Sequence, residues 1–587
     1  MPVNPTVISK DYSRDSLFDH VGLDTLRDRY LVEGETSPQD GLARAAAAYA
    51  DDAAHAQRIY DYASKQWFMF ATPLLSNGGT PRGLPISCFL NYVGDSRKSI
   101  FDHWTENGWL SSAGGGIGTY WGALRSKGEG TSKGSASTGV IPFVKVVDSE
   151  MLAVSQGVTR RGSGAVYLDV SHPEIVEWVG MRKKSGGDLN RKTLNLHNGV
   201  CIPDAFMEAV ERGKQWHLID PHTKQVKETI DARGLWRAIL TTRVETGEPY
   251  LFFSDTANKA LPKPLKDKGL RIHASNLCTE IMLPTNEDRT AVCCLSSVNL
   301  AKWDEWRTDP LFIMDLMRML DNALQSYIDT CPDAHWRAAN SAFHERSVGL
   351  GAMGFHTYLQ MKSVGFGSPQ AAAYNIEMFE HLQQWTDIAS VTLGVERGEA
   401  PDMAGTGERF AHKMAIAPNA TSSIICGNIS PSTEPMVANA YLQKTMGGTF
   451  MVKNQVLEGV LQAHDKDTAS VWRSIATNKG SVQHLDFLTD HERMVFRTAM
   501  EIDQMDIINL AADRQFYIDQ GQSVNIFYPS SVTGKELHRV HFAAWKKGLK
   551  ALYYLRSSAL KRADVAKLAT TRAAVDAPQE ECVACEG

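Results

Sequence analysis

Ser275–Leu300 reads SNLCTEIMLPTNEDRTAVCCLSSVNL, and this stretch carries the strongest indication of both fold and function. Asn276, Cys278 and Glu280 stand at alternate positions, so an extended backbone would place an amide, a thiol and a carboxylate on one side. A thiol can carry a proton, a disulfide or a radical, a carboxylate can accept a hydroxyl proton, and an amide can hold a hydroxyl without titrating. Together the three groups indicate a reaction site.

The same stretch also fits a purely structural role. An acidic turn that begins with a proline, Pro284–Arg289, leads into Ala291–Leu300, which adds Cys293 and Cys294. This pattern is typical of a hairpin of half-buried strands in which small free cysteines fill the core. Composition alone favours the hairpin.

Motifs in this stretch and elsewhere in the chain favour the reaction site instead. N-L-C-x-E followed closely by C-C-L-S-x-x-N-L resembles the active-site loop of the large subunit of class I ribonucleotide reductase. Other stretches resemble motifs of that family in the same order. They are TPLLSNGGTPRGLPISCFL (72–90, substrate binding and first redox cysteine), SQGVTRRGSGAVYLD (155–169, effector loop), PNATSSIICGNISPSTEP (418–435, phosphate turn), LYYLR (552–556, radical-transfer tyrosines) and ECVAC (581–585, reducing tail).

The resemblance implies a fold and a division of the chain. The family fold is a ten-stranded α/β barrel made of two five-stranded halves, with the Cys278 loop threading its centre. We expect residues 1–70 to form a short helical N-terminal region, residues 71–556 the barrel and residues 557–587 a flexible redox tail. Only 87 residues precede Cys88, and a helical run fills most of them, so we expect a compact form without the family's N-terminal ATP-binding module.

The resemblance also implies roles for the reacting residues. Cys278 would carry a transient thiyl radical that removes the 3′ hydrogen of the ribose, Glu280 would take the 3′-hydroxyl proton, and Asn276 would hold that hydroxyl. Cys88 and Cys293 would then reduce the substrate and end as a disulfide.

Two further cysteine assignments follow from the same motifs. Successive strand residues face opposite sides, so only one of Cys293 and Cys294 can face the barrel interior, and the register of the family motif selects Cys293. The tail cysteines Cys582 and Cys585 would reduce the internal disulfide by thiol exchange and pass the oxidation to a thioredoxin or glutaredoxin.

The resemblance predicts partners and ligands as well. Tyr553 and Tyr554 would relay a radical from a metal-containing small (beta) subunit, and the chain itself would form a homodimer that needs no cofactor of its own. Nucleotide substrate is expected at Thr72, Ser87, Thr421, Ser422 and Ser423, and dNTP or ATP effectors at Asp95, Ser96, Arg160 and Arg161.

Composition limits the other possibilities. Lys and Arg number 61 against 67 Asp and Glu in 587 residues, so no basic excess indicates a polymeric nucleic acid as partner. The N-terminus has charges and prolines where a signal peptide would be apolar, and no run approaches a membrane span, so we expect a cytoplasmic protein. A single C-x-x-C pair supplies only half of the ligands of a structural zinc site, so we expect no metal in this chain.

Several local patterns predict secondary structure. Ser37-Pro38-Gln39-Asp40 is typical of a helix start and should open two packed helices, and Asp95–Ser112 and Phe312–Ile328 have helical spacing. The glycine run at 113–118 fits either a phosphate contact or a tight barrel turn. Gly349–Gly354 satisfies G-x-G-x-x-G, but we interpret it as a barrel strand-to-helix turn, since no clear strand precedes it.

Two other functions also fit these motifs. The same barrel serves cobalamin-dependent reductases, which need no tyrosine relay, although the Tyr553–Tyr554 pair favours the class with a partner subunit. A redox-sensing protein, whose cysteines only regulate assembly, would be a non-enzymatic alternative. Nucleotide turnover with an added dithiol would separate it from an enzyme.

Overall fold

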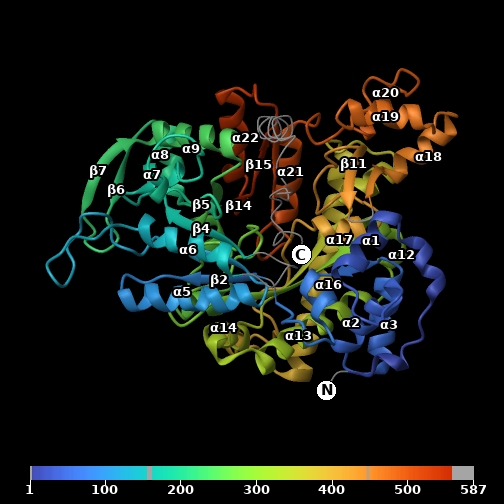
Figure 1. Cartoon of the computed structure of the whole chain (residues 1–587), viewed down its shortest axis with the longest axis horizontal. Helices are drawn as coiled ribbons and strands as arrows, with labels where there is room; N and C mark the ends of the chain where they lie inside the picture. Colours follow the sequence, from blue (N-terminus) through green and yellow to red (C-terminus); the bar gives the residue numbers. More distant parts are fainter. Residues whose placement is uncertain (1–2, 87, 155–161, 446–447, 558–587) are drawn as a thin grey trace.

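One curled sheet forms the framework of the molecule (Figure 1), in a computed structural model that describes residues 3–86, 88–154, 162–445 and 448–557. Within these residues the sheet has nine strands, in the order β1-β9-β2-β3-β4-β5-β8-β14, with β10 paired to β9. The strands are β1 (Phe68–Phe70), β2 (Cys88–Tyr92), β3 (Gly116–Tyr120), β4 (Ser163–Asp169), β5 (His197–Ile202), β8 (Tyr250–Phe253), β9 (Ala291–Asn299), β10 (Val348–Met353) and β14 (Ala551–Leu552).

The sheet closes into a barrel of two parallel halves. In the first half, β2, β3, β4, β5 and β8 pair in parallel. The second half runs from β9 to β10, then through bridges to 414–416 and 522, and on to β13 (Ile526–Tyr528) and β15 (Leu555–Ser557), again in parallel. The halves meet antiparallel at β2–β9 and β8–β14. The predicted ten-stranded α/β barrel of two five-stranded halves is confirmed.

Four helices precede the barrel and pack beside its second half (Figure 1). Ser37 and Asp40 form a capping box at the start of the second helix with Pro38 in its first turn, so the predicted start is confirmed, as is the helix pair that follows. The helices are α1 (His20–Arg29), α2 (Pro38–Ala48), α3 (Ala53–Ser64) and α4 (Thr72–Asn77).

Helices and one hairpin surround the first half. The helix predicted at Asp95–Ser112 begins at Arg97, after the N-cap Ser96. The elements are α5 (Arg97–Ser112), α6 (Ile141–Ala153), α7 (Ile175–Val179), α8 (Asp204–Arg212), α9 (Ala232–Thr246), α10 (Ser254–Ala260), α11 (Lys263–Asp267) and the hairpin β6 (Gln215–Ile219) with β7 (Val226–Asp231).

A further set of helices covers the second half. The helix predicted at Phe312–Ile328 is α13, which packs on α16 and on β9. The helices are α12 (Trp303–Trp306), α13 (Phe312–Thr330), α14 (Trp336–Glu345), α15 (Phe355–Met361), α16 (Pro369–Arg397), α17 (Ala420–Ile425), α21 (Gln504–Gln515) and α22 (Gly534–Lys546). Short 3-10 helices lie at Pro5–Val7, Tyr12–Leu17, Leu189–Arg191, Leu300–Lys302, Asp333–His335 and Pro401–Met403.

A small lobe projects from the second half (Figure 1). Its buried side chains, among them Leu457, Trp472 and Phe496, form a hydrophobic cluster separate from the main core. The lobe consists of the hairpin β11 (Ala440–Thr445) and β12 (Gly448–Lys453) with α18 (Gln455–Ala463), α19 (Ala469–Thr477) and α20 (Asp490–Val495).

The G-x-G-x-x-G run ends at the predicted strand-to-helix turn, between β10 and α15, although its first two glycines lie within the strand. Gly349 and Gly351 belong to β10, and only Gly354, with a φ of 85°, caps α15. A Cβ at Gly351 would lie 2.6 Å from the carbonyl oxygen of Ala415, so glycine is needed there for close strand packing. In the described part of the chain, no helix combines the length and apolar character needed to cross a membrane.

Candidate active site

The finger loop, residues 271–290, passes between the two halves of the barrel. It contains neither helix nor regular strand. A Cβ at Gly118 of β3 would lie 2.2 Å from the carbonyl oxygen of Ser275, and one at Gly521 in the second half would lie 3.0 Å from that of Thr279. Glycines from opposite halves therefore admit the loop backbone to the barrel centre. The predicted central loop is confirmed, and part of the 113–118 glycine run packs against it.

The tip of the finger loop is a turn, not the extended segment that the alternate spacing suggested. The backbone N–H of Thr279 donates to the carbonyl oxygen of Asn276 at 3.4 Å, and Thr279 has a φ of 70°. A positive φ is unfavourable for a β-branched residue, so the surrounding contacts must hold this conformation. The turn gathers Asn276, Cys278 and Glu280, all buried, through loop geometry rather than strand alternation.

Asn276 is fixed on several sides. Its Oδ1 accepts a hydrogen bond from the backbone N–H of Ile281 at 3.1 Å, and its carbonyl oxygen accepts one from the Tyr167 hydroxyl at 2.7 Å. Its Nδ2 lies 3.6 Å from the Sγ of Cys88. The amide therefore connects the finger loop to the first strand of the barrel.

Glu280 is a buried carboxyl with a pKa near neutrality. Burial raises its pKa to about 7, against the opposing effect of hydrogen bonds that include one from Ser523. The Ser523 hydroxyl lies 3.3 Å from Oε2 of Glu280 and 2.5 Å from the carbonyl oxygen of Cys278. A carboxyl of this kind can accept and return a proton at physiological pH.

Cys88 and Cys293 are direct cross-strand partners in the antiparallel pair β2–β9. Both are buried thiols in the same apolar cluster. Burial raises the pKa of Cys293 well above its usual value, although a hydrogen bond from Gln520 opposes the rise. Gln520 bridges the pair to the finger loop, because its Nε2 lies 3.7 Å from Sγ of Cys293 and its Oε1 accepts from the N–H of Met282 at 3.2 Å.

Cys294 faces the other way. It packs in the main hydrophobic core, whereas Cys293 lies in the cluster that contains finger-loop residues. This is the alternation of a strand, and it leaves Cys293 as the cysteine of the pair that faces the barrel interior.

The two tyrosines lie between β14 and β15. Their ring centroids are 4.2 Å apart, and buried Tyr553 shares a hydrophobic cluster with Cys278, while Tyr554 lies at its margin. Tyr250 adds a third ring, 4.8 Å from Tyr553 and 5.1 Å from Tyr554. The aromatic rings thus extend from the partly exposed Tyr554 to the cluster around Cys278.

The predicted phosphate turn coincides with the start of α17. Thr421, Ser422 and Ser423 are buried in its first turn, and Asn419 precedes it with a φ of 55°. The Asn419 side chain makes no capping hydrogen bond to the helix, and its Nδ2 donates to Ser297 at 2.8 Å. Thr72 opens α4, where its hydroxyl lies 2.9 Å from that of Tyr30.

Only part of the predicted effector region can be located. Asp95 is held by Arg125 at 2.8 Å and by His222 at 3.1 Å, and the Ser96 hydroxyl caps α5 by accepting from Ser99. Five predicted site residues lie outside the described residues, namely Ser87, Arg160, Arg161, Cys582 and Cys585.

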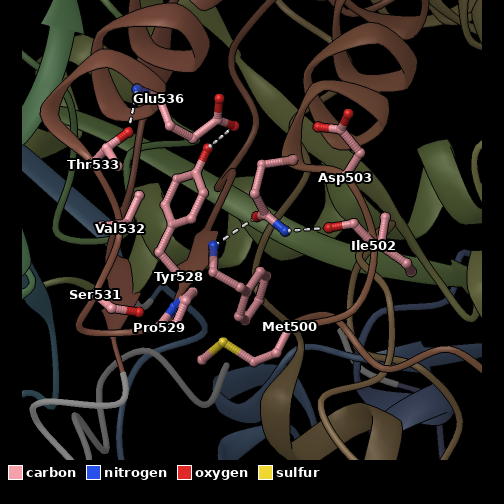
Figure 2. A pocket seen from close by; sticks show the side chains of 11 residues that line it. Met500, Ile502, Asp503, Tyr528, Pro529, Ser531, Val532, Thr533 and Glu536 are labelled. Carbon is pink, nitrogen blue, oxygen red and sulfur yellow. Dashed lines mark hydrogen bonds between the residues drawn. The ribbon is translucent and has the colours of Figure 1, made fainter. Parts of the chain in front are cut away.

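A surface pocket of about 410 Å³ opens between α21 and α22 (Figure 2). Tyr528 on its wall donates to Glu536 at 2.9 Å, and Gln504 accepts from the N–H of Phe527 at 2.7 Å. No predicted site residue lines this pocket. The pocket is therefore separate from the cysteines and from the finger loop.

Several residues of the site had no signal in the sequence. None of these side chains belongs to a recognisable sequence motif, and each contacts the finger loop or the tyrosines only in the folded chain. They are Gln520, Ser523, Tyr250 and Tyr167. Among the described residues, no group of three or more His, Cys, Asp or Glu side chains is arranged to hold a metal ion.

Comparison with known proteins identifies related chains. The family model "Ribonucleotide reductase, barrel domain" matches residues 86–407 and 401–555, and "Ribonucleotide reductase, all-alpha domain" matches residues 16–83. The chain is 43% identical to the ribonucleoside-diphosphate reductase large subunit of Invertebrate iridescent virus 3, covering 99% of this chain and 100% of the relative. It is 46% identical to a putative large subunit of Frog virus 3, covering 91% of this chain and 92% of the relative.

A solved structure agrees with the sequence relatives. The class Id ribonucleotide reductase alpha subunit of Actinobacillus ureae superposes with a TM-score of 0.82 at 36% identity, covering 94% of this chain and 98% of that one. The similarity therefore includes the barrel and the helices before it.

Proposed function

Because the chain belongs to the ribonucleotide reductase large-subunit family, we propose that its finger loop reduces ribonucleoside diphosphates through a thiyl radical on Cys278. The observation that carries this assignment is the convergence inside one barrel of the Asn276–Glu280 turn and the Cys88–Cys293 cross-strand pair. A thiol, a base and a reducing thiol pair are the groups that the reaction requires.

Each buried group then has a defined role in the reaction. The Cys278 radical takes the 3′ hydrogen, while Glu280 receives the 3′-hydroxyl proton and Asn276 orients that hydroxyl. One thiol of the Cys88–Cys293 pair protonates the departing 2′-hydroxyl, and the pair supplies two electrons as it becomes a disulfide. The hydrogen of the second thiol goes to C2′, and Glu280 returns its proton to the 3′ oxygen. The 3′ hydrogen returns from Cys278, which regains the radical.

We further propose partners for the two ends of this cycle. A radical-generating small subunit would oxidise Tyr554 at its partly exposed end, and Tyr553 would pass the oxidation toward Cys278. The pocket is lined by Phe527 and Tyr528 of β13, and β13 pairs with β15, the strand that directly follows Tyr554. A partner bound there would therefore be near the outer tyrosine. Cys582 and Cys585 would re-reduce the internal disulfide, with thioredoxin or glutaredoxin as the final reductant.

Ligand sites follow from the remaining motifs. The start of α17 would hold the substrate phosphates with Thr421, Ser422 and Ser423, because the backbone N–H groups and dipole of a helix start favour an anion. Thr72, at the start of α4, and Ser87 would bind the same nucleotide substrate. Effector nucleotides would bind near Asp95, Ser96, Arg160 and Arg161, at a homodimer contact formed with α5.

The test is turnover of the full chain with a radical-generating small subunit and a dithiol. Cys278→Ser should bind nucleotide normally and form no product, because a hydroxyl O–H is too strong to serve as a radical relay. Product from Cys278→Ser would contradict the assignment. Activity of the chain with adenosylcobalamin alone, unchanged in Tyr553→Phe and Tyr554→Phe, would move it to the cobalamin-dependent class.

A further inference from the structure

The outer tyrosine contacts an imidazole and a carboxylate that the sequence motifs do not include. The hydroxyl of Tyr554 lies 3.2 Å from Nδ1 of His197, at the start of β5. The same Nδ1 lies 2.6 Å from Oε1 of Glu248, just before β8. Three polar atoms from three separate segments are thus brought within hydrogen-bond distance in a row.

Glu248 is fixed as a buried anion. Its Oε2 accepts from the backbone N–H of Asn198 at 2.9 Å and lies 3.4 Å from Nε of Arg182. Burial alone would raise the pKa of Glu248, but Arg182, His197 and the Asn198 hydrogen bond together hold it below its usual value. A carboxylate so fixed orients the imidazole and carries negative charge toward Tyr554.

The surroundings of Tyr554 make it costly for an oxidised ring to keep its proton. The guanidinium of Arg556 lies 4.3 Å from the ring centroid, and Arg243 donates to the carbonyl oxygen of neighbouring Tyr553 at 2.9 Å. A Tyr554 ring that lost an electron but kept its phenolic proton would carry a positive charge beside the Arg556 guanidinium.

From this geometry, and resting on the proposed radical relay, we infer that the His197–Glu248 pair receives the phenolic proton of Tyr554 when that tyrosine is oxidised. The electron leaves Tyr554 for the one-electron oxidant of the partner subunit. The Nδ1 proton of His197 moves to Oε1 of Glu248, and the phenolic proton moves to the vacated Nδ1. Tyr554 becomes a neutral radical, Glu248 is protonated, and the return of the electron reverses both transfers.

The experiment uses the full chain with its radical-generating subunit and compares two variants with a matched control. His197→Phe keeps a ring in the stack with Tyr250 and removes both nitrogens, and Glu248→Gln keeps a hydrogen-bonding group without the charge. We expect each to lower kcat by about 10²-fold, in the range for loss of a proton acceptor, with KM for the nucleoside diphosphate unchanged. His217→Phe, at an exposed imidazole bonded to Thr229, should leave kcat unchanged.

A fluorinated tyrosine at position 554 separates proton transfer from structure. A fluorotyrosine that is already ionised at the assay pH has no proton to lose, so it should restore His197→Phe to the kcat of the fluorotyrosine enzyme with His197. An undiminished kcat in His197→Phe, or a loss that the ionised fluorotyrosine does not relieve, would overturn the inference. If His197→Phe does not fold, His197→Gln is judged by the same criterion.

Different results would refute the radical relay and the proton acceptor. Full activity of Tyr554→Phe would refute the relay itself. An inactive Tyr554→Phe together with fully active His197→Phe and Glu248→Gln would leave the relay standing and refute only the proton acceptor.

Discussion

The two faces of β9 hold adjacent cysteines in different surroundings. Cys293 on the inner face is paired across the sheet with Cys88 and contacted by Gln520, while Cys294 on the outer face packs in the main hydrophobic core. Both thiols are fully buried, and burial raises the pKa of both. Burial therefore does not distinguish a reacting cysteine from a packing one. The distinction comes from a second thiol and polar neighbours on one face.

The largest effect is expected from removing the thiol on the inner face of β9. Cys293→Ala should abolish multiple turnover of nucleoside diphosphate with dithiol and the radical-generating subunit, because Cys88 is left without a thiol partner for two-electron chemistry. Nucleotide binding should be retained, since no charge is lost. Sustained turnover in Cys293→Ala would mean that the β9 register does not identify the reducing pair.

A second change removes the carboxylate of Glu280, the proposed general base, and leaves the thiols intact. Glu280→Gln should lower kcat/KM by about 10²- to 10⁴-fold, the usual contribution of a positioned general base. The amide retains the hydrogen bond with Ser523 and cannot take the 3′-hydroxyl proton. A matched control is Glu150→Gln, which changes another carboxyl with a pKa raised to about 7 by burial, on α6 and without a contact to the finger loop. Equal losses in the two variants would argue against a specific role for Glu280.

The pH dependence of the native enzyme sharpens the same point. The raised pKa of Glu280 means that the carboxyl is protonated at low pH and ionised above about 7. Since only the ionised form accepts a proton, kcat/KM should rise about tenfold per unit below pH 7 and flatten above it. The free energy of unfolding depends on pH in the opposite direction. The neutral buried carboxyl stabilises the folded chain fully below its unfolded pKa, and this stabilisation is lost as pH rises through about 7. A flat acid limb down to pH 5 would contradict this assignment.

The sequence was informative where a short motif determines local geometry. The cap at Ser37 and the alternation of Cys293 and Cys294 depend on neighbouring residues, and both could be predicted. The turn at Thr279 could not, because spacing by two predicts one face only if the backbone is extended. Gln520 and His197 contact groups more than 200 residues away, so only the folded barrel reveals them.

The link between the inner face and the finger loop can be weakened without touching a thiol. Gln520→Met keeps the side-chain volume but removes the hydrogen bonds that Gln520 makes with the N–H of Met282 and the carbonyl oxygen of Val348. We expect kcat to fall about tenfold, as the loop loses a hydrogen bond of ~1 to 3 kcal/mol. Gln39→Met, at a buried glutamine of α2, is the control and should reduce stability with kcat unchanged. Identical kcat values in the two variants would show that Gln520 does not position the loop.

The smallest effect is expected on the outer face of β9. Cys294→Ala removes one buried sulfur from the main core, where β9 packs against α13. The lost apolar contact and the small cavity should cost about 1 to 2 kcal/mol of stability, seen as a slightly lower melting temperature. Turnover should remain within about twofold of the native enzyme, because Cys88, Cys293 and the finger loop are unchanged. A loss of turnover as severe as that of Cys293→Ala, in a chain that still melts cooperatively, would mean that the outer thiol takes part in the chemistry and that strand alternation does not separate the two cysteines.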